Sequence, residues 1–207
     1  MSLEKYITAG CTISKGVIYK DGVNVFEKNN TTLEEFLASI YKHYQLQYPK
    51  YYKMDNLCKL GWLAAEILVK DSFQKDHYQP EEVGMVLANA NSSLDDDIKY
   101  FETTKGISSP SLFVYTLPNI LIGEICIRNT FKGEHTFYIQ DVFDTGFIEK
   151  QVNYLLDENI LKACLCGWVD VLEQDYKAVL FLVEKIKSKQ SVVFSSENMD
   201  NVFNSII

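Results

Sequence analysis

The order of strand-like and helix-like segments is the feature that most constrains how this chain can fold. Residues 82–90 contain a short run that is apolar from Val83 to Ala88, which is typical of a strand buried on both faces. Other strand patterns along the chain are separated by amphipathic segments of helical length. This alternation predicts an α/β fold in which strands are joined by helical crossovers. Residues 161–172 and 177–186 are separated by only four residues, so we expect these last two strands to form an antiparallel hairpin.

Helix patterns between the strands begin at recognisable capping residues. Thr32 and Glu35 form a capping box at the start of one helix pattern. Asp55 is the candidate cap of a second helix, which is apolar over most of its circumference, as a helix packed on a sheet should be. We therefore predict a five-stranded mixed sheet with helices on both faces. Its strands are expected at residues 7–13, 82–90, 135–140, 161–172 and 177–186.

Composition excludes several classes of function. The net charge is −8 and the Lys and Arg residues are dispersed, whereas binding to nucleic acid needs a concentrated basic face. No apolar run approaches the roughly 20 residues of a membrane-spanning helix, and the first ten residues lack a signal-peptide pattern. The five cysteines are scattered through apolar segments, which is typical of reduced core thiols. We expect a cytoplasmic protein with one domain over residues 1–187 and a polar tail over 188–207 that contains a short helix pattern.

Histidine and cysteine spacing predicts no metal or cofactor site. His43, His77 and His135 are the only histidines, and none lies at metal-ligand spacing from another His or Cys. Cys164 and Cys166 are two residues apart in a strand pattern and therefore face the same way. We interpret them as two small apolar residues beneath a helix rather than as a metal or redox pair.

Four segments together resemble a known protein family. They are "YKMDNLCKLGWLAAEIL", "EEVGMVLANANSS", "SPSLFVYTLPNILIGEICIRNTFKGEHTFYI" and "KACLCGWVD". Their order and spacing resemble the N-terminal half of a β-ketoacyl synthase, an enzyme of the thiolase-like fold, over residues 6–185. Residue types typical of the family stand at Pro110, Asn119, Gly123, Gly133 and Gly167. The family topology and right-handed crossovers imply a single thiolase-like half with strand order 3-2-1-4-5 and an edge strand over residues 136–139.

Position 142 decides what chemistry the resemblance allows. In β-ketoacyl synthases the turn after the edge strand holds the cysteine that accepts the acyl group, with its thiolate at a helix N-terminus. That position is Val142 here, and Asp141 beside it places a negative charge where a thiolate and an oxyanion need positive potential. The family's catalytic histidines and lysine belong to the C-terminal half, which this sequence does not include. We therefore expect no condensing activity.

The helix pattern after Val142 bears on whether the chain is a fragment. Ile148, Val152 and Leu155 lie on one stripe of residues 147–159, and polar residues occupy the other side. A helix buried between two thiolase-like halves should instead be apolar all round. We therefore expect a finished protein that consists of one half.

The edge strand is where we expect function to reside. In the family, this strand pairs antiparallel with its counterpart in a second subunit. Residues expected at a partner interface are His135, Phe137, Tyr138, Ile139, Gln140, Phe143 and Phe147. We expect the edge that carries Phe137, Tyr138 and Ile139 to pair with a partner's strand, since an apolar edge strand invites pairing. A proline at Tyr138 tests this pairing if the Tyr138 N–H is paired across the interface.

Non-catalytic family members that pair with active synthases are known as chain-length factors. Small versions of this type resemble the partner subunits of aryl-polyene and flexirubin-like pathways. The leading hypothesis is a subunit that pairs with a full-length β-ketoacyl synthase and shapes its acyl tunnel. Candidate tunnel residues are Tyr115, Asn119 and Val142.

Two other functions stay open. One is a homodimeric protein that binds an acyl chain or an acyl carrier. The other is an acyltransferase or hydrolase with relocated chemistry at Cys126, Ser92 or His135, although the sequence assembles no nucleophile–base pair.

Two charged clusters have ordinary interpretations beside functional ones. Asp95, Asp96 and Asp97 lie in the first turn of a helix pattern, where acidic residues complement the helix dipole more often than they bind Mg²⁺. Arg128, Lys132 and His135 are candidates for contact with an acidic acyl carrier protein. Because the chain itself is acidic, we expect the carrier to dock on the partner subunit, so that its contact with this chain is indirect.

Overall fold

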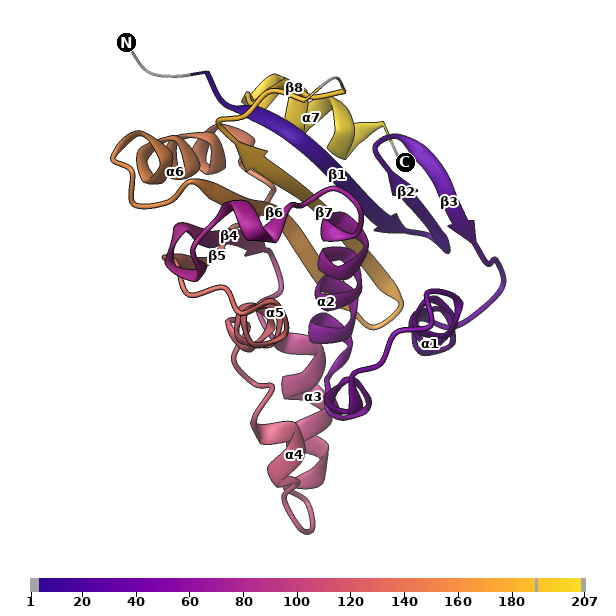
Figure 1. The fold of residues 1–207 in the computed structure, drawn as a ribbon. Coiled ribbons are helices and arrows are strands. Elements are labelled where there is room, and N and C mark those ends of the chain that lie inside the picture. The colour runs from indigo at the N-terminus through magenta and orange to yellow at the C-terminus, as the bar shows by residue number, and fades with distance from the viewer. Residues whose placement is uncertain (1–3, 189, 206–207) are drawn as a thin grey trace.

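A computed structural model describes residues 4–188 and 190–205, which form one mixed sheet with helices on both faces (Figure 1). The described residues place eight strands in this sheet. Seven follow the order β3-β2-β1-β7-β6-β4-β5, and β8 (Val192–Val193) pairs with β1. The predicted α/β class with helices on both faces is confirmed.

The sheet begins with an antiparallel meander that the sequence pattern did not reveal. β1 (Tyr6–Ser14), β2 (Val17–Lys20) and β3 (Val23–Glu27) are joined by two-residue turns at 15–16 and 21–22. All four turn residues have positive φ, between 48° and 79°. This conformation matches the type I′ turns of tight hairpins, which suit the right-handed twist of the flanking strands.

The predicted strand number and order are wrong. β4 (Val83–Asn89) runs parallel to β5 (His135–Ile139) on one side and to β6 (Ala163–Leu172) on the other. β1 was expected at the centre of the sheet beside β4, and it does not lie there. Instead, β7 (Asp175–Glu184) pairs antiparallel with β6 on one side and with β1 on the other. The β6–β7 hairpin is confirmed, and so is the edge position of β5. β7 is therefore the central strand of the seven, and it is paired along its length on both sides.

One face of the sheet is covered by α1 (Leu33–His43), α2 (Asn56–Val69) and α5 (Ile120–Asn129) (Figure 1). The capping box predicted for α1 is present, since the Glu35 N–H donates to Thr32 and the Thr32 N–H donates to Glu35. The Asp55 carboxylate accepts hydrogen bonds from two backbone N–H groups at the start of α2. α2 lies against the middle of the sheet and is buried over most of its surface, as its sequence predicted.

The opposite face is covered by α6 (Thr145–Asp157) and α7 (Ser196–Asn204). α7 is the short helix expected in the C-terminal segment. Its Met199 side chain is buried, and it packs with α6 over a second apolar core. Cys164 and Cys166 are buried on this face beneath the helices, as predicted. Where a domain ends and a tail begins stays a prediction.

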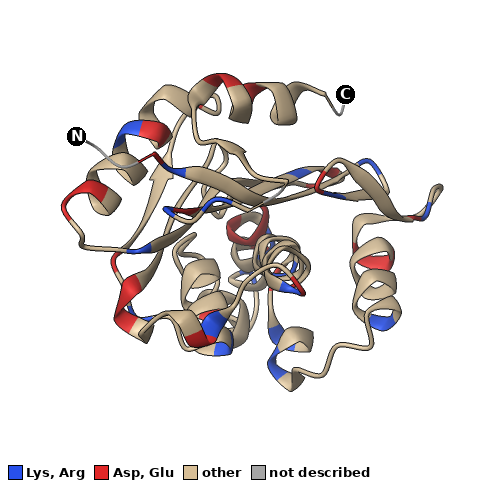
Figure 2. Cartoon of the chain, turned by 45° about the horizontal axis from the view of Figure 1, so that its top comes forward, with Lys and Arg blue, Asp and Glu red and all other residues tan. Residues whose placement is uncertain are grey.

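Two smaller helices extend away from the sheet. α3 (Leu94–Thr103) follows β4, and α4 (Pro110–Phe113) packs against it to form an arm (Figure 1). Three 3₁₀ helices lie on the connections: η1 (Pro49–Lys53), η2 (Lys75–His77) and η3 (Pro80–Glu82). Acidic and basic residues are interspersed along most elements (Figure 2). Among the described residues, no helix is long and apolar enough to span a membrane.

Candidate functional site

The junction between β5 and α6 contains the position of interest, Val142, whose side chain is 71% exposed. The next residue, Phe143, turns inward and packs its ring against Trp168 and Phe203, with centroids 5.8 and 5.0 Å away. The Asp144 carboxylate then accepts a hydrogen bond of 2.8 Å from the Phe147 N–H. The N-terminus of α6 is therefore capped by the chain's own carboxylate, which opposes the binding of an anion there.

The residues that could carry relocated chemistry do not form a catalytic group. His135 stands at the start of β5, whereas Ser92 follows the end of the parallel strand β4, so a strand length of about 13 Å lies between their ends of the sheet. Burial raises the pKa of the Cys126 thiol to about 11, which keeps it protonated near neutral pH. Among the described residues, neither Ser92 nor Cys126 is hydrogen-bonded to a side chain that could act as its base.

The register of β5 decides which of its main-chain groups are free. The Met85 N–H donates to the Glu134 carbonyl and the Gln140 N–H donates to the Asn89 carbonyl. Because N–H and C=O groups alternate sides along a strand, residues 134, 136, 138 and 140 direct theirs toward β4. The N–H and C=O groups of His135, Phe137 and Ile139 therefore point to the open edge. The condition for the Tyr138→Pro test is not met, because the Tyr138 N–H faces β4.

The side chains of β5 split between the two cores and the solvent. Phe137 packs on the α2 side of the sheet, and Tyr138 packs edge-on against Phe147 at 4.8 Å on the α6 side. The Tyr138 hydroxyl also donates to Gln151 at 3.2 Å. Ile139 is 52% exposed and His135 is exposed, so these two side chains remain available at the edge.

The other residues expected at the interface differ in accessibility. Phe143 is buried within this chain and offers little surface to a partner. Phe147 is half-buried against Tyr138. Gln140 is half-buried, and its side-chain oxygen has no hydrogen-bond partner among the described residues.

An exposed apolar surface on the α3–α4 arm was not predicted from the sequence. The residues that make up this arm surface are Leu94, Ile98, Phe101, Ile107, Phe113, Val114 and Leu117, each between 42% and 95% exposed. Exposed apolar groups that gather in one region mark interaction sites more often than chance. A signal was present, since Leu94, Ile98 and Phe101 lie at helical spacing and large apolar residues recur among the Gly, Ser and Pro residues that follow.

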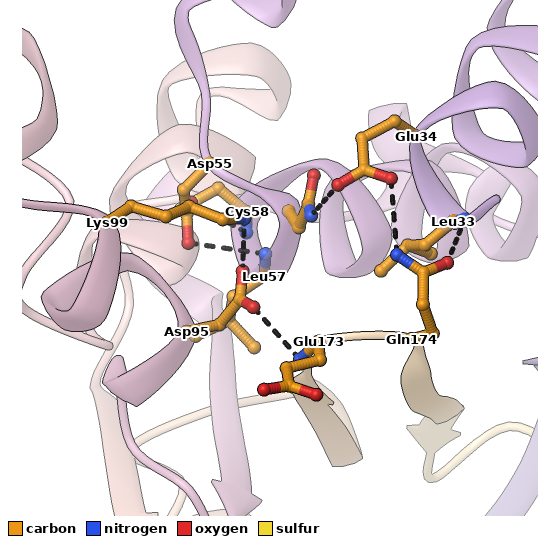
Figure 3. A network of polar contacts seen from close by, with 10 residues as sticks. Leu33, Glu34, Asp55, Leu57, Cys58, Asp95, Lys99, Glu173 and Gln174 are labelled. Carbon is orange, nitrogen blue, oxygen red and sulfur yellow. Dashed lines mark hydrogen bonds and ion pairs between the residues drawn. The ribbon is translucent and has the colours of Figure 1, made fainter.

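Of the acidic residues at the start of α3, Asp95 belongs to a network of polar contacts (Figure 3). Asp95 forms an ion pair of 2.7 Å with Lys99 and accepts a hydrogen bond of 3.0 Å from the Glu173 N–H. Asp96 is 1% exposed, and neither of its carboxylate oxygens has a hydrogen-bond partner in the described chain. Burial, with the Asp55 charge next, raises its pKa to about 7. No group of His, Cys, Asp or Glu side chains with metal-binding geometry occurs among the described residues.

Comparison with solved structures identifies the architecture. An ishigamide ketosynthase/chain length factor aligns with 87% of this chain and 62% of its own, at 16% identity and a TM-score of 0.63. A ketosynthase (ApeO) in complex with its chain length factor (ApeC) from Xenorhabdus doucetiae aligns with 88% of this chain and 79% of its own, at 14% identity and a TM-score of 0.56. This chain has a ketosynthase-like fold.

Other ketosynthase structures agree. A type II polyketide synthase ketosynthase, in complex with its acyl-carrier protein, matches at 13% identity and a TM-score of 0.59, over 89% of this chain and 63% of that chain. The chain thus spans less than two thirds of the length of most of these neighbours. Comparison of the sequence with protein-family models and with curated proteins gave no match. The ketosynthase-like resemblance found in the sequence is confirmed at the level of the fold.

Within the ketosynthase-like fold, the tunnel candidates occupy different environments. Tyr115 is buried between the α3–α4 arm and the first core, Asn119 is exposed at the start of α5, and Val142 is exposed at the β5–α6 turn. Their role as tunnel residues stays a prediction. Of the carrier candidates, Arg128 is paired with Glu66 at 3.1 Å, whereas Lys132 and His135 are exposed.

Proposed function

We propose that this chain is a non-catalytic ketosynthase-like subunit that pairs with a full-length ketosynthase, as a chain-length factor does. The observation that carries the proposal is the open edge of β5. Three of its residues direct main-chain groups outward that pair with no other described strand, and a half-exposed isoleucine lies among them. Open strand edges of this kind pair readily with another chain, and natural proteins usually protect them.

The absence of a nucleophile at the β5–α6 turn supports a non-catalytic role. Val142 has no group that can attack a thioester, and Asp141 and Asp144 flank it with negative charge. Two solved neighbours are by name assemblies of a ketosynthase with a chain length factor. Those names describe the neighbours, and they support the same role for this chain.

The exposed arm surface adds a second element to the proposed interface. Leu94 begins α3 a few residues after Asn89, and Asn89 pairs with Ile139 of the edge strand. The first residue of the arm and the end of the edge strand therefore lie at the same end of the sheet. We propose that a ketosynthase covers both, and that its acyl tunnel is shaped by residues of this chain near Tyr115 and Val142.

Association with a synthase is the direct test. The chain is co-expressed with a tagged full-length ketosynthase encoded beside it, and the purified material is measured by size-exclusion chromatography with light scattering. A complex with the summed mass of both chains is expected, and the synthase should make products of a different length when the chain is present. A chain that elutes alone beside a homodimeric synthase would overturn the proposal.

The same open edge favours one alternative. β5 could pair with its own copy, since two antiparallel copies of one strand form a symmetric ladder. A stable homodimer that does not associate with the ketosynthase, and that binds an acyl chain or acyl carrier protein, would support a homodimeric binding protein instead. The light-scattering masses distinguish the two assemblies.

A further inference from the structure

A groove of about 530 Å³ lies on the α1–α2 side of the molecule, away from the edge strand. The side chains of α1, η1 and α2 that matter to the argument are Glu34, Tyr41, Lys42, Tyr51, Tyr52 and Lys59. Its volume is within the range of protein ligand sites, about 300–1,000 Å³.

The lining of this groove carries more positive than negative charge, in a protein with a net charge of −8. Its charged residues are two lysines, Lys42 and Lys59, and one carboxylate, Glu34. Asp55 is buried and caps α2, so it contributes little negative charge to the surface. In Figure 2, basic segments mark the end of α1 and the short η1 helix.

The lysines of the groove are not engaged by carboxylates. Among the described residues, no carboxylate lies within ion-pair distance of Lys42 or Lys59. Lys59 is half-buried, with its ammonium nitrogen 5.9 Å from the centre of the Tyr51 ring. Burial lowers its pKa, and a bound anion would offset that cost.

The one carboxylate that lines the groove is already occupied. Glu34 accepts hydrogen bonds from the side-chain amides of Asn56 at 2.9 Å and Gln174 at 3.5 Å (Figure 3). Burial opposes the ionisation of Glu34, but these hydrogen bonds outweigh burial and lower the pKa of Glu34. Lys42 and Lys59 therefore remain as the free charges of the groove.

Tyrosines supply the remaining walls. Tyr41 and Tyr51 stack with their ring centres 4.1 Å apart, and the buried Tyr51 hydroxyl has no hydrogen-bond partner among the described residues. Tyr52 stands edge-on to both rings and is 73% exposed. A buried hydroxyl without a partner is costly unless a ligand or water completes it.

The length of the groove matches a short extended peptide. Glu34 and Lys42 are eight residues apart on α1, which corresponds to about 12 Å at 1.5 Å per residue. An extended chain covers that distance with about four residues, at about 3.3 Å each.

We propose that this groove binds an acidic, extended segment of about four residues from a partner protein. Carboxylates of the segment lie at Lys42 and Lys59, and an apolar side chain packs on Tyr52. This inference goes beyond the proposed pairing with a synthase, because the groove and the β5 edge are separate surfaces. It can therefore hold or fail independently of that pairing.

The test is fluorescence anisotropy with a defined probe. The probe is a fluorescein-labelled peptide of sequence Gly-Glu-Asp-Leu-Glu-Asp with an amidated C-terminus, titrated with the purified full chain in 50 mM NaCl. The control peptide carries Gln and Asn in place of Glu and Asp. The acidic peptide should bind at least tenfold more tightly than the neutral one, and 300 mM NaCl should weaken its binding severalfold.

Variants locate the binding site. Lys42→Glu and Tyr52→Ala change exposed side chains and should each weaken binding, Lys42→Glu by at least tenfold. Lys150→Glu makes the same charge change at an exposed residue of α6, on the opposite face of the sheet. It should alter binding less than twofold. The proposal is overturned if the acidic peptide does not bind, if both peptides bind equally, or if Lys42→Glu and Lys150→Glu have equal effects.

Discussion

At the scale of single residues, Val142 stands at the position that the family resemblance assigns to the nucleophile. The turn is formed by Phe143 packing inward and by the Asp144 cap, and neither contact needs a nucleophile. The same cap occupies the Phe147 N–H in the first turn of α6, where free N–H groups would stabilise a thiolate. The turn therefore lacks a nucleophile, and the helix N-terminus beside it is already capped by a carboxylate.

A cysteine at position 142 should not restore activity. In Val142→Cys, the charges of Asp141 and Asp144 would raise the thiol pKa, and no histidine of the described chain stands at this end of β5. Catalytic groups that act as a unit cannot be rebuilt singly. We expect condensation of malonyl units at least about a thousandfold slower than by an ordinary synthase. Intact mass measurement after incubation with acyl-CoA checks for an acyl adduct, with the parent chain as control; a synthase-like rate would contradict this account.

Asp96 should make the stability of the chain depend on pH. Its pKa of about 7 in the folded chain lies above the unfolded value of about 3.9. Between these values the folded state keeps a proton that the unfolded state releases, so the free energy of unfolding falls as pH rises through that window. Between pH 4 and pH 8, the free energy of unfolding of the parent should fall by on the order of 1–3 kcal/mol more than that of Asp96→Asn.

Urea unfolding of both proteins at several pH values measures this difference. Asp76→Asn is the matched control, because Asp76 is exposed on η2. If Asp96→Asn and Asp76→Asn keep the same pH dependence as the parent, the buried carboxyl of Asp96 is not the group responsible.

At the scale of elements, the sequence predicted local features better than pairing. The caps at Thr32 and Asp55 were predictable because a side chain bonds backbone only two or three residues away. The β1–β2–β3 meander was missed because β2 has only four residues and β3 is mostly exposed, which leaves little apolar alternation. Its turns at 15–16 and 21–22 were visible as Gly-containing pairs.

Strand order lies beyond such local signals. Strand patterns show that β1 and β7 are apolar, but which neighbour each takes depends on long-range packing. The edge position of β5 followed from the family resemblance. The direction of each β5 N–H group did not, because it depends on a register that one residue of slip would reverse.

The register of β5 determines which substitution tests pairing at the open edge. The Ile139 N–H points outward, so Ile139→Pro should leave the β4–β5 ladder intact and remove one donor from a ladder with a partner. Compared with Ile139→Ala, which removes the side chain alone, Ile139→Pro should bind the ketosynthase about tenfold more weakly, from a lost hydrogen bond worth about 1–1.5 kcal/mol. Tyr138→Pro should instead lower the melting temperature of the chain alone. Sedimentation or light scattering of mixtures gives the affinities, and equal binding of the proline and alanine variants at Ile139 would exclude edge pairing.

At the scale of the whole molecule, the sheet separates two apolar cores that are covered by different parts of the chain. Residues 33–131 supply the helices of one face, whereas α6 and the C-terminal α7 cover the other. β8 ties the segment before α7 to β1, so the C-terminal residues contact the N-terminal strand through the sheet. This arrangement predicts that α7 unfolds together with the rest of the chain.

Met199 tests that cooperativity. Its side chain is fully buried with α6 and sheet residues in the second core, so Met199→Ala should lower the free energy of unfolding by about 2–5 kcal/mol. Asn201→Ala changes an exposed residue of the same helix and should stay within about 0.5 kcal/mol of the parent. Thermal unfolding followed by far-ultraviolet circular dichroism and by tryptophan fluorescence should give one coincident transition at a lower temperature for Met199→Ala, because Trp168 lies in the same core. An unchanged main transition in Met199→Ala would mean that α7 is a separate, weakly attached element and that the second face of the sheet is stable without it.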